Sequence, residues 1–210
     1  IEASFGTDTA CKLYSELIGN IMRDAMSARK YWHFVKLMGR SASHVTLECA
    51  LQTQPNIALI SEEVQANSTT LAEIVDHIAS VVIQRAQNGH HFGVALIPEG
   101  LIEFIPAMGT LIGEVNDLLA RNPDLQDTLP VAVDVETLVA SGLTEDSATA
   151  YLQLPEDIRM QLVMDRDDHG NVQVSRIETE KLLITMVGQT VQERAAGTKF
   201  SSHAHFFGYE

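Results

Sequence analysis

The stretch Tyr31-Trp-His-Phe-Val-Lys-Leu-Met38 decides how this chain folds. It is aromatic and apolar over almost its whole length, which is typical of a strand that is buried on both faces. Gly39 ends this stretch, and two similar apolar runs follow at residues 57–60 and 92–97. Because a helical pattern accompanies each of these runs, we predict right-handed βαβ units on a parallel sheet. The expected fold class is α/β: a Rossmann-like domain of three layers, with a mainly parallel sheet and added helices.

The helices on either side of the first strand follow from apolar periodicity. We expect a helix over residues 8–28, in which four apolar residues recur on one face: Leu13, Leu17, Ile18 and Ile21. Ser41 or Ser43 can begin a second helix, which extends through Leu51.

The clearest helix of the chain follows Thr70. Thr70 and Glu73 have the spacing of a capping box, in which each residue satisfies a backbone N–H of the other. Asn88-Gly89 then ends the apolar periodicity. The sequence therefore predicts a helix from Thr70 to Asn88.

After residue 100 the pattern loosens into a mostly helical region at about 107–170. We expect helices in three ranges: 107–120, 134–140 and 145–164. The cluster at 165–171 is rich in Asp, Asn and Gly, which indicates a turn. A short strand at 172–174 is expected to follow this turn.

The sequence of the last part of the chain predicts a helix followed by a strand. Ser175 and Glu178 again have capping-box spacing, so we predict a helix that runs to about Ala195 with Ile177 on its apolar face. Residues 200–207 are the candidate for a final strand.

Charge and composition exclude several kinds of function. The 210 residues include 14 Lys and Arg against 28 Asp and Glu, for a net charge of −14. Such a chain repels phosphate backbones and anionic lipid, so we expect neither nucleic acid nor membrane as a partner. The two cysteines, Cys11 and Cys49, form no disulfide framework, which favours a reducing, cytoplasmic setting.

Ligands of open α/β sheets bind at the carboxyl ends of the strands. The sequences that follow three of the predicted strands are Met38-Gly39-Arg40, Pro98-Glu99-Gly100 and Gly208-Tyr209. Arg40 offers a planar fork of donors for phosphate, and the carboxylate of Glu99 can accept hydrogen bonds from sugar hydroxyls. Each of these sequences alone is better explained as an ordinary turn, but three of them in one sheet favour a binding cleft.

Metal and nucleophile motifs are weak in this sequence. The run from Asp165 resembles the start of an EF-hand loop, but its twelfth position is Arg176 instead of Glu. His203 and His205 share one face of the last strand without a carboxylate or thiol nearby in sequence, so we expect no zinc site. No residue stands out as a general base.

Several long motifs resemble those of the phosphofructokinases, and in particular of their pyrophosphate-dependent branch. The resemblance covers essentially the whole chain and rests on these stretches: Phe5-Gly6-Thr7-Asp8-Thr9-Ala10, Lys30-Tyr31-Trp32-His33-Phe34, Leu37-Met38-Gly39-Arg40-Ser41-Ala42-Ser43, Ile97-Pro98-Glu99-Gly100-Leu101-Ile102-Glu103-Phe104, Gly170-Asn171-Val172-Gln173-Val174-Ser175, Ile177-Glu178-Thr179-Glu180-Lys181 and His205-Phe206-Phe207-Gly208-Tyr209-Glu210. It implies reversible transfer of a phosphoryl group from pyrophosphate to fructose 6-phosphate, a step of glycolysis.

The resemblance also implies roles for individual residues. Met38, Gly39 and Arg40 would contact fructose 6-phosphate, and Glu99 would bind its hydroxyls. Tyr209 and Glu210 would open a further substrate-binding segment.

Three more residues would act across a subunit interface. By the same resemblance, Lys30 and Tyr31 would reach into the substrate site of a partner in a homodimer. Arg23 aligns with a phosphate ligand that a neighbouring subunit supplies in ATP-dependent relatives.

The family's catalytic Asp loop and its segment for the phosphoryl donor and Mg²⁺ have no counterpart in these residues. The resemblance therefore implies that residues 1–210 are the fructose-6-phosphate-binding domain of a longer chain. We expect no catalytic residue and no metal ligand in this part, and no activity from it alone. Mg²⁺ and pyrophosphate would bind elsewhere in the longer chain.

Three alternatives remain open from the sequence. The chain could be a non-catalytic sugar-phosphate-binding or regulatory module, it could belong to the ATP-dependent version of the enzyme, or it could be an acidic scaffold domain. Binding of fructose 6-phosphate would exclude the scaffold. The residues that choose between ATP and pyrophosphate would lie before Ile1.

Overall fold

In the part of the chain that the structure describes, four strands form one parallel sheet in the order β2-β3-β1-β4. The strands are β1 (Trp32–Leu37), β2 (Ile57–Ala58), β3 (Gly93–Pro98) and β4 (Ser202–Phe207). Strand β1 pairs along its whole length with both neighbours, so that Trp32 lies opposite Gly93 and Ser202. All four carboxyl ends therefore lie at one edge of the sheet.

The computed structural model describes residues 6–122, 135–167 and 169–208. The chain divides into two compact units. Unit 1 comprises residues 1–101 and 179–210 and contains the sheet, and unit 2 comprises residues 102–178.

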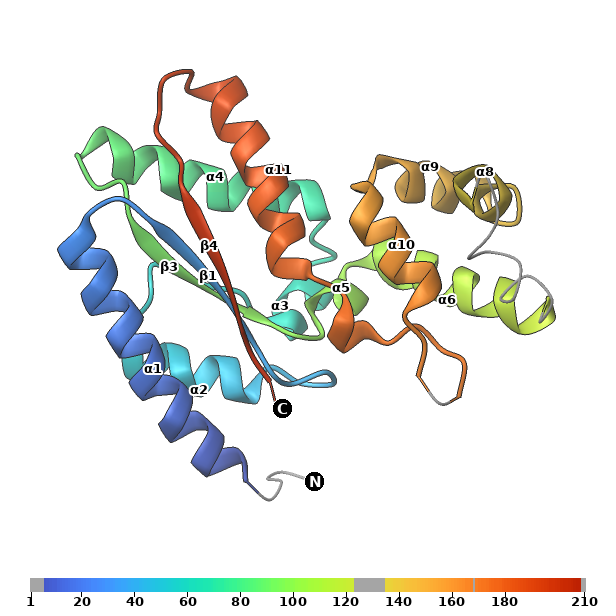
Figure 1. The fold of residues 1–210 in the computed structure, drawn as a ribbon, viewed down its shortest axis with the longest axis horizontal. Coiled ribbons are helices and arrows are strands. Elements are labelled where there is room, and N and C mark those ends of the chain that lie inside the picture. The colour runs from blue at the N-terminus through green and yellow to red at the C-terminus, as the bar shows by residue number, and fades with distance from the viewer. Residues whose placement is uncertain (1–5, 123–134, 168, 209–210) are drawn as a thin grey trace. The chain divides into compact units, whose positions relative to one another are not determined.

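Helices cover both faces of the sheet in unit 1 (Figure 1). One layer is formed by α1 (Thr7–Ala28) and α2 (His44–Thr53), and the other by α4 (Leu71–Gln87) and α11 (Thr179–Arg194). The short helix α3 (Ser61–Ala66) follows β2. Both central strands, β1 and β3, are buried over their whole length. The predicted three-layer α/β fold with a parallel sheet is confirmed.

Helix α1 forms where expected but buries a different face. Its buried residues are Cys11, Tyr14, Ile18 and Ala25. The predicted face is wrong for Leu13 and Leu17, which are 52% and 37% exposed. The buried stripe includes Cys11 and Tyr14, which pack in one core cluster with β1 and α2, so a count of aliphatic residues alone selected the wrong face.

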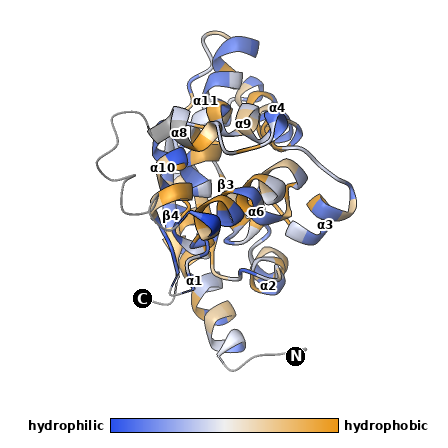
Figure 2. Ribbon diagram, turned by 90° about the vertical axis from the view of Figure 1, so that its right-hand side faces the viewer, coloured by the Kyte–Doolittle hydropathy of each residue, from blue (hydrophilic) through white to orange (hydrophobic). Residues whose placement is uncertain are grey.

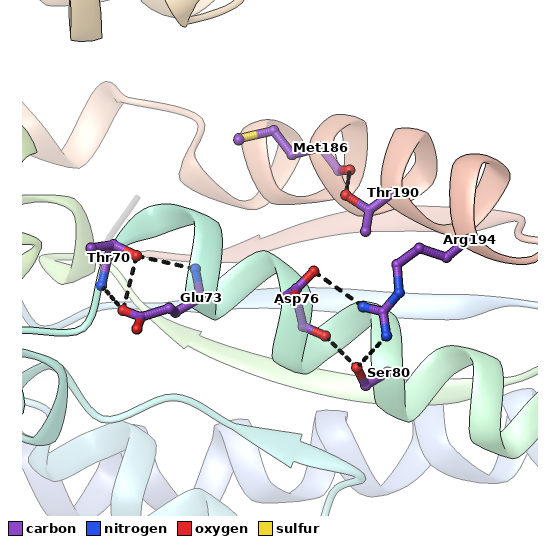
Figure 3. A network of polar contacts seen from close by, with 7 residues as sticks. All are labelled: Thr70, Glu73, Asp76, Ser80, Met186, Thr190 and Arg194. Carbon is purple, nitrogen blue, oxygen red and sulfur yellow. Dashed lines mark hydrogen bonds and ion pairs between the residues drawn. The ribbon is translucent and has the colours of Figure 1, made fainter.

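Helix α4 begins with the predicted capping box. The backbone N–H of Thr70 donates to Glu73 Oε2 at 2.8 Å, and Thr70 Oγ1 accepts from the Glu73 N–H at 3.2 Å (Figure 3). The middle of α4 meets α11, where Arg194 donates to Asp76 at 3.1 Å and to Ser80 at 3.2 Å. These contacts join the two helices that cover one face of the sheet.

The strand predicted at 172–174 is wrong. Val172 makes a single antiparallel bridge with Arg166, and Val174–Arg176 is a turn of 3₁₀ helix. The turn predicted at 165–171 is present, since the N–H of Asp167 donates to the carbonyl of Asn171 at 2.8 Å. Instead of pairing in a sheet, this segment is held by a side chain of α6, since the N–H of Val172 donates to Asn116 Oδ1 at 2.8 Å.

The capping box predicted at Ser175 and Glu178 is wrong as well. The N–H of Glu178 donates to Gln161 Oε1 at 2.9 Å, and the Gln161 amide donates back to the Glu178 carboxylate at 3.1 Å. Helix α11 begins at Thr179, so Ile177 lies outside it. A side chain from a distant helix has taken the place of the local cap.

Two further boundaries differ from the prediction. Strand β2 has two residues, Ile57–Ala58, instead of four. The helix expected over 145–164 is broken into α9 (Glu145–Gln153) and α10 (Glu156–Met164). The break falls at Leu154-Pro155, because proline disfavours helical backbone in the residue before it.

Unit 2 is mostly helical in its described residues. Besides α9 and α10 it contains α6 (Pro106–Arg121), α8 (Val135–Ala140) and a 3₁₀ turn, η2 (Val174–Arg176), and the short helix α5 (Leu101–Phe104) begins at its border with unit 1. Hydrophobic and hydrophilic residues alternate along α6 (Figure 2), which packs its apolar face on α9 and α10. The helical region predicted at about 107–170 falls within this unit. None of the helices in the described ranges of either unit is long and apolar enough to cross a bilayer.

Candidate substrate site at the carboxyl edge of the sheet

The two central strands carry their predicted motifs to the same edge. Strand β1 ends at Leu37, directly before Met38-Gly39-Arg40, and β3 ends at Pro98, directly before Glu99. The N–H of Glu99 donates to the carbonyl of Leu37 at 2.9 Å, which extends the pairing of the strands beyond β3. The strand register therefore brings both motifs side by side.

A side-chain hydrogen bond joins these two motifs. The N–H of Gly39 donates to Glu99 Oε2 at 3.3 Å, and the N–H of Gly100 donates to the carbonyl of Gly39 at 3.3 Å. Glu99 is buried, with 9% of its surface exposed. One carboxylate oxygen is thus held by the backbone of the neighbouring loop, which fixes the orientation of the other.

Glycine is required at both loops for steric reasons. Gly39 has a φ of +132°, and a Cβ there would lie 2.8 Å from the carbonyl oxygen of Ala42. A Cβ on Gly100 would lie 1.9 Å from the carbonyl oxygen of Arg40, well inside any permitted contact. The close approach of the two loops therefore depends on the absence of both side chains.

The two joined loops carry a cation and a carboxylate. Arg40 is exposed and follows Gly39, whose N–H donates to the buried Glu99. A guanidinium can donate two parallel hydrogen bonds to a phosphate, and a carboxylate accepts from hydroxyls. Together they suit a ligand that carries both groups, such as a sugar phosphate.

The loop after Arg40 is anchored by residues that the sequence did not single out. The N–H of Ser43 donates to Glu62 Oε1 at 2.9 Å, and the N–H of Ser61 donates to Ser43 Oγ at 2.9 Å. Partial burial acts to raise the pKa of Glu62, but the backbone hydrogen bonds of Ser43 and of Glu62 itself outweigh it, so that pKa is lowered. The position of Glu62 after the apolar run of β2 was the available signal for this anchor.

The end of β4 is tied to both β1 and α1. The N–H of Met38 donates to the carbonyl of Phe207 at 3.0 Å, and the hydroxyl of Tyr14 donates to the carbonyl of Gly208 at 3.0 Å. Tyr14, Met38 and Gly208 also line a pocket of about 350 Å³ together with the first turns of α1. The remaining predicted site residues of this strand, Tyr209 and Glu210, lie outside the described residues.

Lys30, Tyr31 and Arg23 do not join this site. Lys30 and Tyr31 precede β1, at the end of the strand opposite to Met38, and Arg23 is exposed in the last two turns of α1. Eight residues of extended chain correspond to about 26 Å between Lys30 and Met38. A single sugar phosphate cannot bridge that distance.

A histidine cluster lies near the amino end of β1. His33 Nδ1 is 2.9 Å from His205 Nε2, and the His203 ring lies 5.5 Å from the His33 ring. Burial, followed by His205 and His203, lowers the pKa of His33 to about 4 against a smaller opposing effect of Asp24. Among the described residues, no group of three or more His, Cys, Asp or Glu side chains is placed to hold a metal ion.

The acidic charge is distributed unevenly. Unit 2 contains 15 of the 28 acidic residues of the sequence and 4 of its 14 basic residues. Unit 1, which holds the strand ends, is therefore much closer to neutral. The net charge of the whole chain does not oppose an anionic ligand at this edge.

Comparison with known proteins shows which family this chain resembles. The phosphofructokinase family profile, described as "Phosphofructokinase", matches residues 1–137. The chain is 56% identical to the pyrophosphate–fructose 6-phosphate 1-phosphotransferase of Treponema pallidum and 55% identical to that of Porphyromonas gingivalis. It is 52% identical to the beta 1 subunit of the Arabidopsis thaliana enzyme of the same name.

These alignments include the whole of this chain but only part of each relative. The chain spans 37% of the Treponema protein, 39% of the Porphyromonas protein and 36% of the Arabidopsis subunit. The family profile covers more than half of the chain, and it includes both motifs that meet at the sheet edge. The chain therefore belongs to the phosphofructokinase family.

Proposed function

We propose that this chain is the fructose-6-phosphate-binding part of a longer, pyrophosphate-dependent phosphotransferase. The observation that carries the proposal is the hydrogen bond between Gly39 and Glu99, which joins the two substrate motifs at the carboxyl edge of the sheet. The names of the similar proteins support the identity of both substrates. The presence of a guanidinium and a buried carboxylate on two joined loops supports the sugar phosphate independently.

The proposed roles follow from the position of each group. The exposed guanidinium of Arg40 binds a phosphate oxygen or hydroxyl, while the free lone pairs of Glu99 accept hydrogen bonds from the sugar. Met38 and Gly39 contact the ligand through the backbone. Tyr209 and Glu210 are proposed as further contacts after β4.

In the proposed reaction the 1-hydroxyl oxygen of fructose 6-phosphate forms a bond to one phosphorus of pyrophosphate. The bridging P–O bond of pyrophosphate breaks, the hydroxyl gives up its proton, and fructose 1,6-bisphosphate and phosphate result. This chain holds the sugar so that its hydroxyl is aligned with the phosphorus, which removes much of the entropic cost of the encounter. The base and the Mg²⁺ that neutralises the transferring group belong to other parts of the longer protein.

Pyrophosphate is favoured over ATP as the phosphoryl donor. The relatives from Treponema, Porphyromonas and Arabidopsis are all named for pyrophosphate. The ATP-dependent version is the alternative, and activity with each donor distinguishes the two.

We further propose a homodimer that works in the cytoplasm. Lys30 and Tyr31 lie too far from Met38 to contact the same sugar phosphate within one chain. A second subunit would resolve this, because each substrate site would then combine Met38 of one chain with Lys30 and Tyr31 of the other. Arg23 is a weaker candidate for the same role. The buried free thiols of Cys11 and Cys49 support a reducing compartment.

Removal of Arg40 tests the substrate site directly. In the full-length protein, Arg40→Ala should weaken fructose 6-phosphate binding by about 10- to 100-fold, because a charge-assisted hydrogen bond contributes about 1.5 to 3 kcal/mol. Arg121→Ala is the matched control, since Arg121 is exposed on α6 and pairs only loosely with Asp117 at 3.5 Å. Equal losses from the two changes, measured by calorimetry, would exclude the assigned site.

Glu99→Gln gives a second and independent test. The amide oxygen can still accept from the Gly39 N–H, so the loops should stay joined while the sugar loses a charged acceptor. Affinity for fructose 6-phosphate should fall about tenfold. Wild-type affinity in this variant would contradict the role of Glu99.

The alternatives predict different outcomes of the same measurements. Fructose 6-phosphate binding without turnover by the full-length protein, given pyrophosphate or ATP and Mg²⁺, would indicate a non-catalytic binding module. Absence of binding would indicate a scaffold.

A further inference from the structure

A buried ion pair crosses the core of unit 1 just behind the proposed substrate site. Lys36 Nζ lies 3.3 Å from Glu180 Oε2, and the two side chains are 2% and 5% exposed. Among the described residues Glu180 Oε2 accepts no hydrogen bond, so the ammonium of Lys36 supplies its compensation. Few charged side chains are buried to this extent unless they are paired.

Lys36 is the next-to-last residue of β1, an inner strand of the sheet. It lies on β1, opposite Ile97 of β3 and Phe206 of β4. Each of these three residues comes two positions before a predicted site residue or loop: Lys36 before Met38, Ile97 before Glu99, and Phe206 before Gly208. Lys36 is therefore flanked in the sheet by the residues that precede the other two strand ends.

Two contacts fix the ammonium group from different elements. Glu180 comes from the first turn of α11, immediately after the chain returns to unit 1. The ring of Phe206 lies 4.3 Å from Lys36 Nζ, a cation–π contact from the edge strand β4. The ammonium thus links the beginning of α11 to two of the strands that end at the site.

Stability alone does not account for such a pair. Desolvation of two charges costs about as much as their attraction returns, and apolar residues of similar volume are often at least as stable in such places. What a buried pair does provide is one defined arrangement, because any displacement leaves a charge without its partner. This argues for a role in geometry.

We propose that Lys36 and Glu180 are positioning residues for the substrate site. Their ion pair fixes β1 against the start of α11, and the cation–π contact of Lys36 with Phe206 fixes β4 beside β1. The pair acts on the ligand only through the strand ends, which present Met38-Gly39-Arg40. The proposal deepens the proposed function and rests on it for the identity of the ligand. Its structural part can be measured without any activity.

The main test removes both charges together in the full-length protein. The double variant Lys36→Met with Glu180→Leu replaces both members of the buried pair by apolar side chains of similar size, so it should unfold at a denaturant concentration close to that of the wild type. The KM for fructose 6-phosphate should nevertheless rise at least about tenfold, with kcat changed less than about threefold. Amide exchange at Met38 and Glu99, whose N–H groups donate to Phe207 and Leu37, should accelerate by about tenfold.

The same helix offers a matched control. Arg194, in the last turn of α11, pairs with Asp76 of α4 at 3.1 Å, with side chains that are 43% and 68% exposed. The double variant Arg194→Met with Asp76→Asn also removes an ion pair from α11, but far from the strand ends. It should leave the KM and the exchange rates at wild-type values.

The single variant Glu180→Gln covers the case in which the double variant does not fold. Glutamine keeps the size of the side chain and removes only its charge, so the KM and the exchange rates should move in the same direction. Wild-type KM and wild-type exchange in either folded variant would overturn the positioning role. The proposed function can also fail by itself. If the wild-type full-length protein shows no phosphotransferase activity, while the variants show faster exchange at Met38 and Glu99, the positioning role is upheld and the proposed function is rejected.

Discussion

Gly39 and Glu99 stand 60 residues apart in the sequence, and the N–H of Gly39 donates to Glu99 Oε2 at 3.3 Å. This bond joins the loops that follow the two central strands of the sheet. One carboxylate oxygen of Glu99 is thereby used for structure, and the guanidinium of Arg40 follows directly on the bonded glycine. The arrangement of the proposed site thus depends on how closely the two loops approach.

Gly100→Ala adds only one methyl group, but it should strongly disrupt the proposed site. A Cβ at this position would lie 1.9 Å from the carbonyl oxygen of Arg40, so one of the loops has to move. We expect fructose 6-phosphate affinity to fall at least about tenfold and stability to fall by about 1 to 3 kcal/mol, as for other overpacked sites. Calorimetry and denaturant unfolding of the full-length protein measure the two effects.

Gly19→Ala is the control for this prediction. A Cβ at Gly19 meets nothing within 4 Å, and the residue lies inside α1. Alanine should stabilise the helix by about 0.5 to 1 kcal/mol and leave affinity unchanged. Similar losses of affinity in both variants would contradict the steric argument.

Stability should fall as the pH is lowered through the range of the histidine cluster. The pKa of His33 is lowered to about 4 by burial, His205 and His203, whereas an unfolded histidine has a pKa near 6.5. The unfolded state then binds more protons below pH 6.5, so its free energy decreases relative to the folded state. Between pH 7 and pH 4 the loss from this group should be on the order of 2 to 3 kcal/mol, measured by urea unfolding.

His33→Asn should flatten this pH dependence. Removal of the imidazole abolishes the difference in proton binding between the folded and unfolded states at position 33. The control is His77→Gln, on the exposed side of α4, which keeps the cluster intact and should keep the pH dependence of the wild type. An equally steep pH dependence in the His33 variant would show that other groups are responsible.

The two thiols should be nearly inert in the folded protein. Burial raises the pKa of Cys49 to about 11, and burial followed by the charges of Glu48 and Asp8 raises that of Cys11. Since the thiolate is the reactive form, both should react with a disulfide reagent at pH 8 at least about 100-fold more slowly than a free thiol. Urea should release two fast-reacting thiols, and fast labelling of the folded protein would contradict their burial.

Mixed dimers test whether the site is shared between subunits. Full-length Lys30→Ala and Arg40→Ala proteins should each be strongly impaired. In a mixed dimer both lesions fall in one site and leave the other intact, so mixing should restore up to about half the activity of that dimer. If mixed dimers form and activity stays at the level of either variant alone, Lys30 acts within its own subunit or not at all.

Local sequence patterns predicted the strands β1 and β3, the helix α4 with its capping box, and the three-layer architecture. They succeeded because apolar periodicity and capping chemistry are properties of neighbouring residues. The motifs at Met38 and Pro98 were also visible as sequences that follow buried strands, and parallel strands place their ends at one edge.

Contacts between distant segments were beyond the reach of the sequence. Gln161 supplies the hydrogen bonds that a local cap at Ser175 was expected to make, and His33 meets His205 across 172 residues. The same holds for the anchoring of Ser43 by Glu62 and for the ion pair of Lys36 with Glu180. The sequence by itself determined which elements form and which residues follow them, because those depend on local backbone preferences. Only the tertiary structure decided which side chains meet, because that depends on the register of strands whose pairing partners lie far apart in the chain.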